Sequence, residues 1–251
     1  CAGPAPETAQ MEFDPDEEYF FDTVNGGYLD GKAVKKARKE ELEWVHQKKI
    51  WEHRDTEECW RVTGKPPVPL KWVDTNKGDD EIPLIRSRLV AREIKRAKKK
   101  HEQLQPQDLF SAMPPLEGLR ILVSLMLTQK VSKRGKPLRL ALFDISRAHF
   151  NGTAQRDVYV VLPEEEGAGP GKCGKLLKGM YGTQDASHIW QLDYKELMNE
   201  NGHQEGKSNT AVFLGKNDEK SLVHGDDFGI LGDEDDIKAM EVMLGSKYEY
   251  R

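Results

Sequence analysis

Three aspartates at the ends of apolar segments are the residues in this sequence best suited to chemistry. Asp144 ends one such segment, and Asp226 and Asp227 sit between two others, 222–223 and 228–231. A carboxylate pair in a tight turn between buried strands is costly unless a cation or a shared proton offsets its charge. Mg²⁺ prefers a few carboxylates with water and substrate phosphates. Two such ions about 4 Å apart can activate an attacking hydroxyl and stabilise the leaving oxygen in phosphoryl transfer.

A simpler interpretation of the same residues is that Asp226 and Asp227 only form a turn. Asp beside Gly is a common turn signal, and Gly225 precedes the pair. The third carboxylate, Asp144, favours the metal interpretation only modestly. The elements and motifs around the three aspartates must therefore decide between the two.

The negative net charge does not by itself exclude nucleic-acid binding, because the charges are segregated along the chain. The 251 residues carry a formal charge of −5, which on its own argues against nucleic-acid binding. Residues 1–30 contain eight acids and no Lys or Arg, whereas residues 86–100 contain eight bases and one acid. Such a basic stretch is an electrostatic signature of nucleic-acid contact. The three cysteines have no metal-binding spacing, which favours a reducing compartment, and no apolar run is long enough to span a membrane.

The elements that would position the aspartates alternate between helices and strands. Residues 1–31 are acidic and predict a disordered leader, and residues 32–251 predict the folded part. The apolar patterns predict helices near 31–52, 116–128, 185–201 and 233–246. They predict strands near 60–63, 70–74, 82–91, 138–145, 158–162, 211–214, 221–223 and 228–231. This order is typical of an α+β architecture, and it places Asp144 and the Asp226–Asp227 pair on separate strands.

Several motifs in this frame resemble the reverse transcriptases of copia-type retrotransposons. In chain order they are RLVAR (88–92), FSAMP (110–114), FDISRAHFNG (143–152), VYVVLP (158–163), KLLKGMYG (175–182) and VHGDD (223–227). Each is unspecific alone, but their order and spacing match the family from about residue 32 to residue 251. The resemblance implies the fingers and palm of a right-hand polymerase, the palm being an antiparallel sheet backed by helices, with the thumb absent from this stretch.

In such enzymes the three aspartates hold two Mg²⁺ ions, for which Mn²⁺ is a potential substitute. By resemblance, Asp144 and Asp226 bridge the metals and Asp227 supports them more loosely. The implied partners are an RNA or DNA template–primer, dNTPs and the remainder of a Pol polyprotein with RNase H and integrase, without a membrane. The implied location is intracellular, either in cytoplasmic virus-like particles or in the nucleus.

Four further residues are candidates for nucleotide binding by their positions in these motifs. Arg86 and Arg88 would hold the triphosphate, because a guanidinium fork suits phosphate oxygens; the alternative is a solvated strand face. His149 stands where the family usually has Phe, beside the sugar of the nucleotide, although an isolated His is more often a packed residue. Gly182 would let the backbone approach template and nucleotide, or would merely form a turn.

A second group of candidates concerns the nucleic acid. The basic run of Lys95, Arg96, Lys98, Lys99 and Lys100 could neutralise template phosphates. It could equally be solvated surface or a nuclear-import signal. Trp190 is interpreted as a core residue rather than a base-stacking one.

Two departures from the family pattern stand close to the candidate site. His224 and Gly225 replace the usual Tyr and Val or Met before the aspartate pair, which removes a side chain that normally packs on the primer end. After Gly182, the usual Leu-Lys-Gln-Ala-Pro is Thr-Gln-Asp-Ala-Ser, so that an expected Lys is Gln184 and an expected amide is Asp185.

Three functional hypotheses follow. The first is an RNA-directed DNA polymerase core, which transfers a nucleotide from a dNTP to a primer 3′-hydroxyl with two Mg²⁺. The second is a catalytically silent remnant that at most binds nucleic acid. The third, a Mg²⁺-dependent phosphohydrolase using the same aspartates, would release phosphate without a template.

Overall fold

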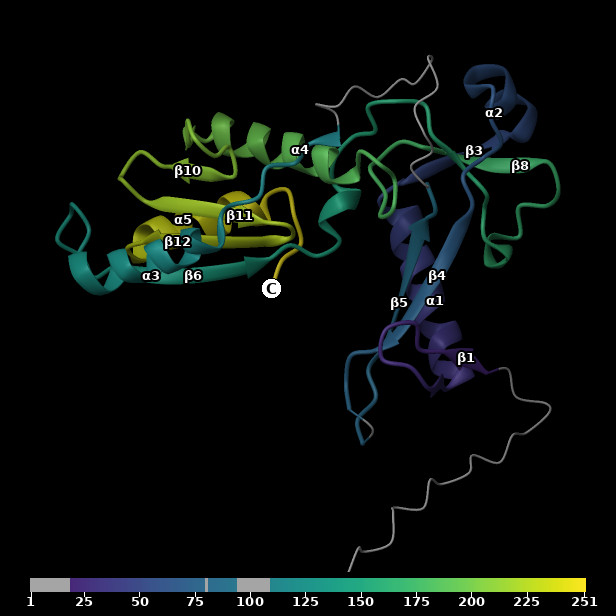
Figure 1. Cartoon of the computed structure of the whole chain (residues 1–251), viewed down its shortest axis with the longest axis horizontal. Helices are drawn as coiled ribbons and strands as arrows, with labels where there is room; N and C mark the ends of the chain where they lie inside the picture. The colour runs from purple at the N-terminus through teal and green to yellow at the C-terminus, as the bar shows by residue number, and fades with distance from the viewer. Residues whose placement is uncertain (1–18, 80, 94–108) are drawn as a thin grey trace, which may run out of the picture. The chain divides into compact units, whose positions relative to one another are not determined.

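The fold combines helices with antiparallel sheets in two units. The structure is a computed structural model that describes residues 19–79, 81–93 and 109–251 (Figure 1). One unit takes in residues 1–44 and 71–89, and the other takes in residues 45–70 and 90–251. The predicted α+β class is confirmed by this mixture of elements.

The first unit contains most of two small two-stranded sheets and most of helix α1 (Gly31–Gln47). Its sheets pair β1 (Phe20–Phe21) with β2 (Tyr28–Leu29), and β4 (Leu70–Asn76) with β5 (Ile85–Ala91).

Ordered structure in this unit begins before residue 32, in contrast to the predicted leader. The carboxylate of Asp22 accepts hydrogen bonds from the backbone amides of Val24, Asn25 and Asn76, each 2.8 Å long. Burial raises the pKa of Asp22, but these amides outweigh it and hold the pKa well below its ordinary value. This charged anchor fixes the β1–β2 turn to β4. The remainder of the predicted leader, residues 1–18, lies outside the described residues.

A five-stranded sheet forms the centre of the second unit, in the order β6-β12-β11-β10-β9. Its neighbouring strands all pair in antiparallel fashion. The strands are β6 (Arg139–Asp144), β9 (Gln204–Glu205), β10 (Val212–Leu214), β11 (Lys220–His224) and β12 (Asp227–Gly232). The strands predicted near 138–145, 211–214, 221–223 and 228–231 are confirmed.

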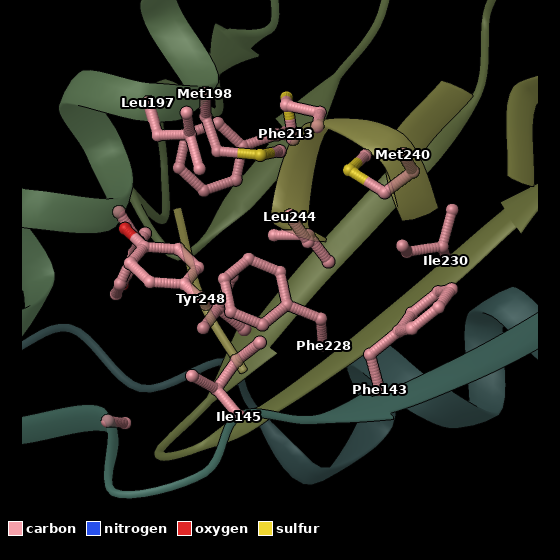
Figure 2. Packing of buried hydrophobic residues seen from close by; sticks show 14 of the residues in the cluster. Phe143, Ile145, Leu197, Met198, Phe213, Phe228, Ile230, Met240, Leu244 and Tyr248 are labelled. Carbon is pink, nitrogen blue, oxygen red and sulfur yellow. The ribbon is translucent and has the colours of Figure 1, made fainter. Parts of the chain in front are cut away.

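Helices cover both faces of this sheet because alternate strand residues are apolar on each side. On one face, side chains of α4 (Ala186–Glu200) and α5 (Glu234–Gly245) pack with Phe143, Phe213 and Phe228 in the largest buried cluster (Figure 2). On the other face, Leu122 of α3 (Leu116–Gln129) packs on Leu222 and Leu231. Strands β6 and β12 are thereby held between two apolar layers.

A smaller, three-stranded sheet in the second unit corrects two predictions. It has the order β3-β8-β7, with β3 at Trp51–Asp55, β7 at Tyr159–Val160 and β8 at Lys172–Leu176. The helix predicted to reach residue 52 ends at Gln47, because Lys49 takes a positive φ of 53° and the chain then pairs with β8.

The segment predicted as a strand near 60–63 is instead the end of helix α2 (Thr56–Thr63). Cys59 faces inward and packs against Tyr159 and Cys173, while Gly64 ends the helix with a left-handed φ of 65°. Gly adopts this left-handed conformation without a steric penalty, and its amide donates a hydrogen bond to the carbonyl of Trp60 in the last turn. The apolar residues in this segment thus follow a helical period, but the segment is too short for that period to be recognised from the sequence.

The helix predicted near 233–246 is confirmed as α5, and the acids at residues 233–236 form its start. Asp233 is the N-cap residue in a capping box with Asp236. The guanidinium of Arg134 pairs with both carboxylates, and Ser132 donates to Asp233 at 2.8 Å. Burial raises the pKa of Asp233, but the hydrogen bonds from Arg134 and Ser132 outweigh it and lower the pKa to about 2.

This arrangement predicts an acid-dependent loss of stability. Because the folded-state pKa of Asp233 lies below its unfolded value, its contribution is complete above about pH 4 and is lost as pH falls towards 2. In urea denaturation, the unfolding free energy of the wild type should fall more steeply between pH 4 and pH 2 than that of Asp233→Asn. Asn still caps a helix but carries no titrating carboxyl. Parallel pH profiles for the two proteins would contradict the prediction.

Candidate active site

Two of the predicted aspartates lie directly opposite each other in the five-stranded sheet. Asp144 is the last residue of β6 and pairs in register with Asp227, the first residue of β12. Directly opposed residues of an antiparallel pair project to the same face, and both side chains are exposed. Asp226 precedes Asp227 in the turn, and its carbonyl accepts a hydrogen bond from Ile145 at 2.8 Å. The ladder thus brings all three aspartates to one end of two neighbouring strands.

The turn that carries Asp226 explains the glycine before the aspartate pair. His224 and Asp227 close the β11–β12 hairpin, so its two turn residues are Gly225 and Asp226. Gly225 has a φ of 62°, and Asp226 does not have a positive φ. This is the pattern of a type II′ turn, which favours Gly at its first central position. The indole Nε1 of Trp190 donates to the carbonyl of Gly225 at 2.9 Å, which anchors the turn to the core.

His149 lies beside this turn, on the short helix η2 (Ala148–Phe150). Its Nδ1 is 3.8 Å from Oδ1 of Asp226, and its Nε2 is 3.4 Å from the hydroxyl of Ser187 at the start of α4. The imidazole also packs on Tyr181, with ring centroids 4.6 Å apart. The structure therefore brings His149 together with Asp226.

Gly182 follows Tyr181 in the turn between β8 and α4, where a side chain cannot fit. Its φ is 83°, and a Cβ atom would lie 1.9 Å from the carbonyl oxygen of Ala91. The amide of Ala91 donates to the carbonyl of Tyr181 at 2.7 Å. The turn thus lies directly against Ala91, the last residue of β5, and this close approach requires glycine.

Replacing Gly182 by Ala is expected to lower the free energy of unfolding. A positive φ alone costs about 1–3 kcal/mol in a residue with a side chain, and the contact with Ala91 should add to this cost. The matched control is Gly135→Ala, because Gly135 has a φ of 76° but no atom within 4 Å of an added Cβ. Urea denaturation of both variants separates the steric contact from the backbone strain. Equal losses of stability would show that the contact with Ala91 contributes nothing.

The remaining predicted residues belong to the first unit, to the part of the chain outside the described residues, or to the apolar core. Arg86 and Arg88 occupy alternate positions on β5 in the first unit, the former exposed and the latter half-buried. The basic run, which consists of Lys95, Arg96, Lys98, Lys99 and Lys100, lies outside the described residues. Trp190 is buried in the largest apolar cluster, in agreement with its interpretation as a core residue.

One residue near the aspartates is absent from the sequence prediction. The amide of Asp144 donates to the carbonyl of Arg251 at 3.0 Å, and the amide of Arg251 donates to the carbonyl of Asp144 at 2.9 Å. This reciprocal pairing sets Arg251 opposite Asp144 on the edge of β6 away from β12, so both side chains project to one face. The alternating Tyr248-Glu249-Tyr250-Arg251 pattern is typical of a strand and could have revealed it.

The aspartates fit a hard divalent cation by their chemistry. Carboxylate oxygens are the protein ligands that Mg²⁺ and Mn²⁺ prefer, and Asp144 and Asp227 present theirs on one exposed face. Within residues 19–79, 81–93 and 109–251, no group of three or more His, Cys, Asp or Glu side chains converges closely enough to enclose an ion. Mg²⁺ usually keeps several waters and binds through one or two carboxylates plus substrate phosphates, so the residues present are compatible with it.

Comparison with known proteins assigns the class of protein that this sheet and these carboxylates define. A family model described as reverse transcriptase (RNA-dependent DNA polymerase) matches residues 57–251. The chain belongs to this reverse transcriptase family, which confirms the resemblance found in the sequence motifs.

A curated relative has a similar sequence over much of the chain. The Retrovirus-related Pol polyprotein from transposon RE1 of Arabidopsis thaliana is 25% identical over 185 residues, which cover 70% of this chain. The match spans 12% of the length of that relative. In the part of the chain that the structure describes, no helix is both long and apolar enough to cross a bilayer.

Proposed function

We propose that this chain is the core of an RNA-directed DNA polymerase that extends a primer on an RNA template. The observation that carries the proposal is the pairing of Asp144 with Asp227, beside Asp226, within the residues matched by the reverse transcriptase family. In this proposal the five-stranded sheet and its helices act as the palm, and β4 and β5 belong to the fingers.

The three aspartates have distinct roles in the proposed reaction. Asp144 and Asp226 would hold two Mg²⁺ ions, and Asp227 would support them from the opposite strand. The bound ions would activate the primer 3′-hydroxyl and stabilise the leaving oxygen. The hydroxyl attacks the α-phosphate of the dNTP, so a new P–O bond forms while the bond to pyrophosphate breaks. Charges fixed on two paired strands need little rearrangement during this step.

Several further residues are proposed to bind the nucleotide. Arg86 and Arg88 supply guanidinium groups for the triphosphate. His149 stands next to Asp226 and packs on Tyr181, a position suited to contact with the sugar. Gly182 allows a close backbone approach, and Arg251 supplies a cation opposite Asp144 for a phosphate oxygen.

The template–primer would lie across the same face of the sheet. The basic run of residues 95–100 would neutralise template phosphates, a contact that weakens as salt concentration rises. A Pol polyprotein is the proposed parent of this chain, since the relative from transposon RE1 carries that name.

The test is extension of a DNA primer annealed to an RNA template, with dNTPs and Mg²⁺. The proposal expects product that depends on the template and disappears on chelation of Mg²⁺. Phosphate release without a template would instead indicate a phosphohydrolase. Binding of the template–primer without extension would indicate a catalytically silent nucleic-acid-binding protein.

A further inference from the structure

A buried cluster of charges lies next to the Gly182 turn but outside the aspartate site. Arg156 donates from Nη1 to Glu93 at 2.8 Å, and from Nε and Nη2 to Asp185 at 3.0 Å each. The three side chains are between 4% and 15% exposed. Burial opposes the charge on Arg156, but the hydrogen bonds to Glu93 and Asp185 outweigh it and raise its pKa above its ordinary value. We call Arg156, Glu93 and Asp185 the Arg156 cluster.

The Arg156 cluster joins three segments that are distant in the sequence. Glu93 follows β5, Arg156 precedes β7, and Asp185 directly precedes α4. Asp185 occupies the N-cap position of α4 but makes no capping hydrogen bond, because its carboxylate is turned to Arg156. Glu93 also accepts a hydrogen bond from the amide of Gln184 at 2.9 Å.

These contacts fix the turn from Tyr181 to Asp185 at both of its ends. The Tyr181 carbonyl accepts from Ala91, and Gly182 fits against the Ala91 backbone with no room for a side chain. The other end is held by Glu93 and Arg156. Tyr181 in turn packs on His149, whose Nδ1 is 3.8 Å from Asp226. A continuous chain of contacts therefore runs from Arg156 to the aspartate site.

We propose that Arg156 is a positioning residue for nucleotide binding, which holds the Tyr181–Asp185 turn in place without itself contacting the nucleotide. This inference rests on the proposed polymerase function. It also gives a role to Asp185, the acidic residue that stands where the family usually has an amide. Asp185 serves as an internal counterion of Arg156 and leaves nucleotide contact to the backbone at Gly182.

Arg156 holds the Tyr181–Asp185 turn in place because it balances the negative charges of the Arg156 cluster. One guanidinium compensates two buried carboxylates, and only a planar fork of donors can bind both at once. Removal of the guanidinium would leave two like charges close together with little solvent, which is strongly unfavourable. The turn would then move away from Ala91 and shift Tyr181 and His149.

The chain contains a matched control for this substitution. Arg134 also joins two carboxylates, those of Asp233 and Asp236, at the start of α5. The side chains of Asp233 and Asp236 are at most 2% exposed, against 15% for Glu93 and 4% for Asp185, while Arg134 itself is more exposed than Arg156. Arg134 contacts none of the residues of the Tyr181–Asp185 turn in these pairings, so Arg134→Gln tests the effect of losing a comparable cluster elsewhere in the unit.

The experiment compares Arg156→Gln, Arg156→Lys and Arg134→Gln by primer extension and by amide hydrogen exchange. We expect Arg156→Gln to raise the KM for dNTP on the order of tenfold or more while the Kd for template–primer stays unchanged, since small displacements of binding groups have large kinetic effects. Arg156→Lys keeps the charge but lacks the fork, and should give an intermediate KM. Arg134→Gln should leave both constants unchanged.

Hydrogen exchange tests the structural part without any need for activity. In Arg156→Gln the amides of Ala91 and Gln184 should exchange faster, while those at the start of α5 do not; Arg134→Gln should show the reverse. Equal KM values for the wild type and both Arg156 variants would overturn the proposal, as would unchanged exchange at Gln184. If the wild type extends no primer, the polymerase proposal and the nucleotide role of Arg156 fail together, whereas faster exchange at Gln184 would still establish how the turn is held.

Discussion

The Asp226→Asn variant is expected to lose template-directed primer extension by on the order of a thousandfold or more, because it removes one charge from a preorganised electrostatic site. Asp226 lies in the β11–β12 turn next to His149. Asn has nearly the same shape and is well tolerated in turns, so the fold should be retained. The loss would therefore report on chemistry rather than on stability.

A single-nucleotide extension assay on an RNA template with Mg²⁺ measures this effect. Asp218→Asn is the matched control, because Asp218 lies in the next hairpin turn of the same sheet, between β10 and β11. Its φ of 75° is one that Asn adopts readily. The control should extend primers at nearly the wild-type rate. Full activity in Asp226→Asn would remove this aspartate from the mechanism.

The largest expected effect on stability comes from Trp190→Ala, which should lower the free energy of unfolding by about 3–5 kcal/mol. Trp190 is 2% exposed. Its indole ring makes edge contacts with Tyr194, Phe228 and Tyr248. Its Nε1 also donates to Gly225 in the turn before Asp226, so the substitution removes both buried apolar area and an anchor of the site.

Urea denaturation of two further variants separates these contributions. Trp60→Ala, at a Trp that is 51% exposed, should change stability by only about 0.5 kcal/mol. Trp190→Phe keeps most of the apolar contact but removes the hydrogen bond to the Gly225 carbonyl, at a cost of about 0.5–1.5 kcal/mol because Gly225 is exposed to water. Similar losses for Trp60→Ala and Trp190→Ala would show that the buried cluster is not the main source of stability.

The sequence alone determined the strands that carry the aspartates and the helices that cover them. The β6 and β12 segments are short apolar runs ended by polar residues, and such local patterns need no distant partner to be recognised. The acids at 233–236 likewise indicate where α5 begins, because a capping box involves only neighbouring residues. The resemblance of ordered motifs then led to the family that comparison confirms.

Only the tertiary structure decided the features that depend on distant residues. The segment 60–63 is helical because Cys59 packs on Tyr159 and Cys173, and α1 ends at Gln47 because the following residues pair with β8.

The neighbours of the candidate site also come from distant parts of the chain. Arg251 reaches Asp144 across 107 positions of sequence through one reciprocal backbone pair. The Arg156 cluster consists of Glu93, Arg156 and Asp185. The sequence alone does not distinguish any of these residues from a solvated charge on the surface. Periodicity reports which face of an element is apolar, whereas the partner of a buried charge is chosen by the packing of the whole chain.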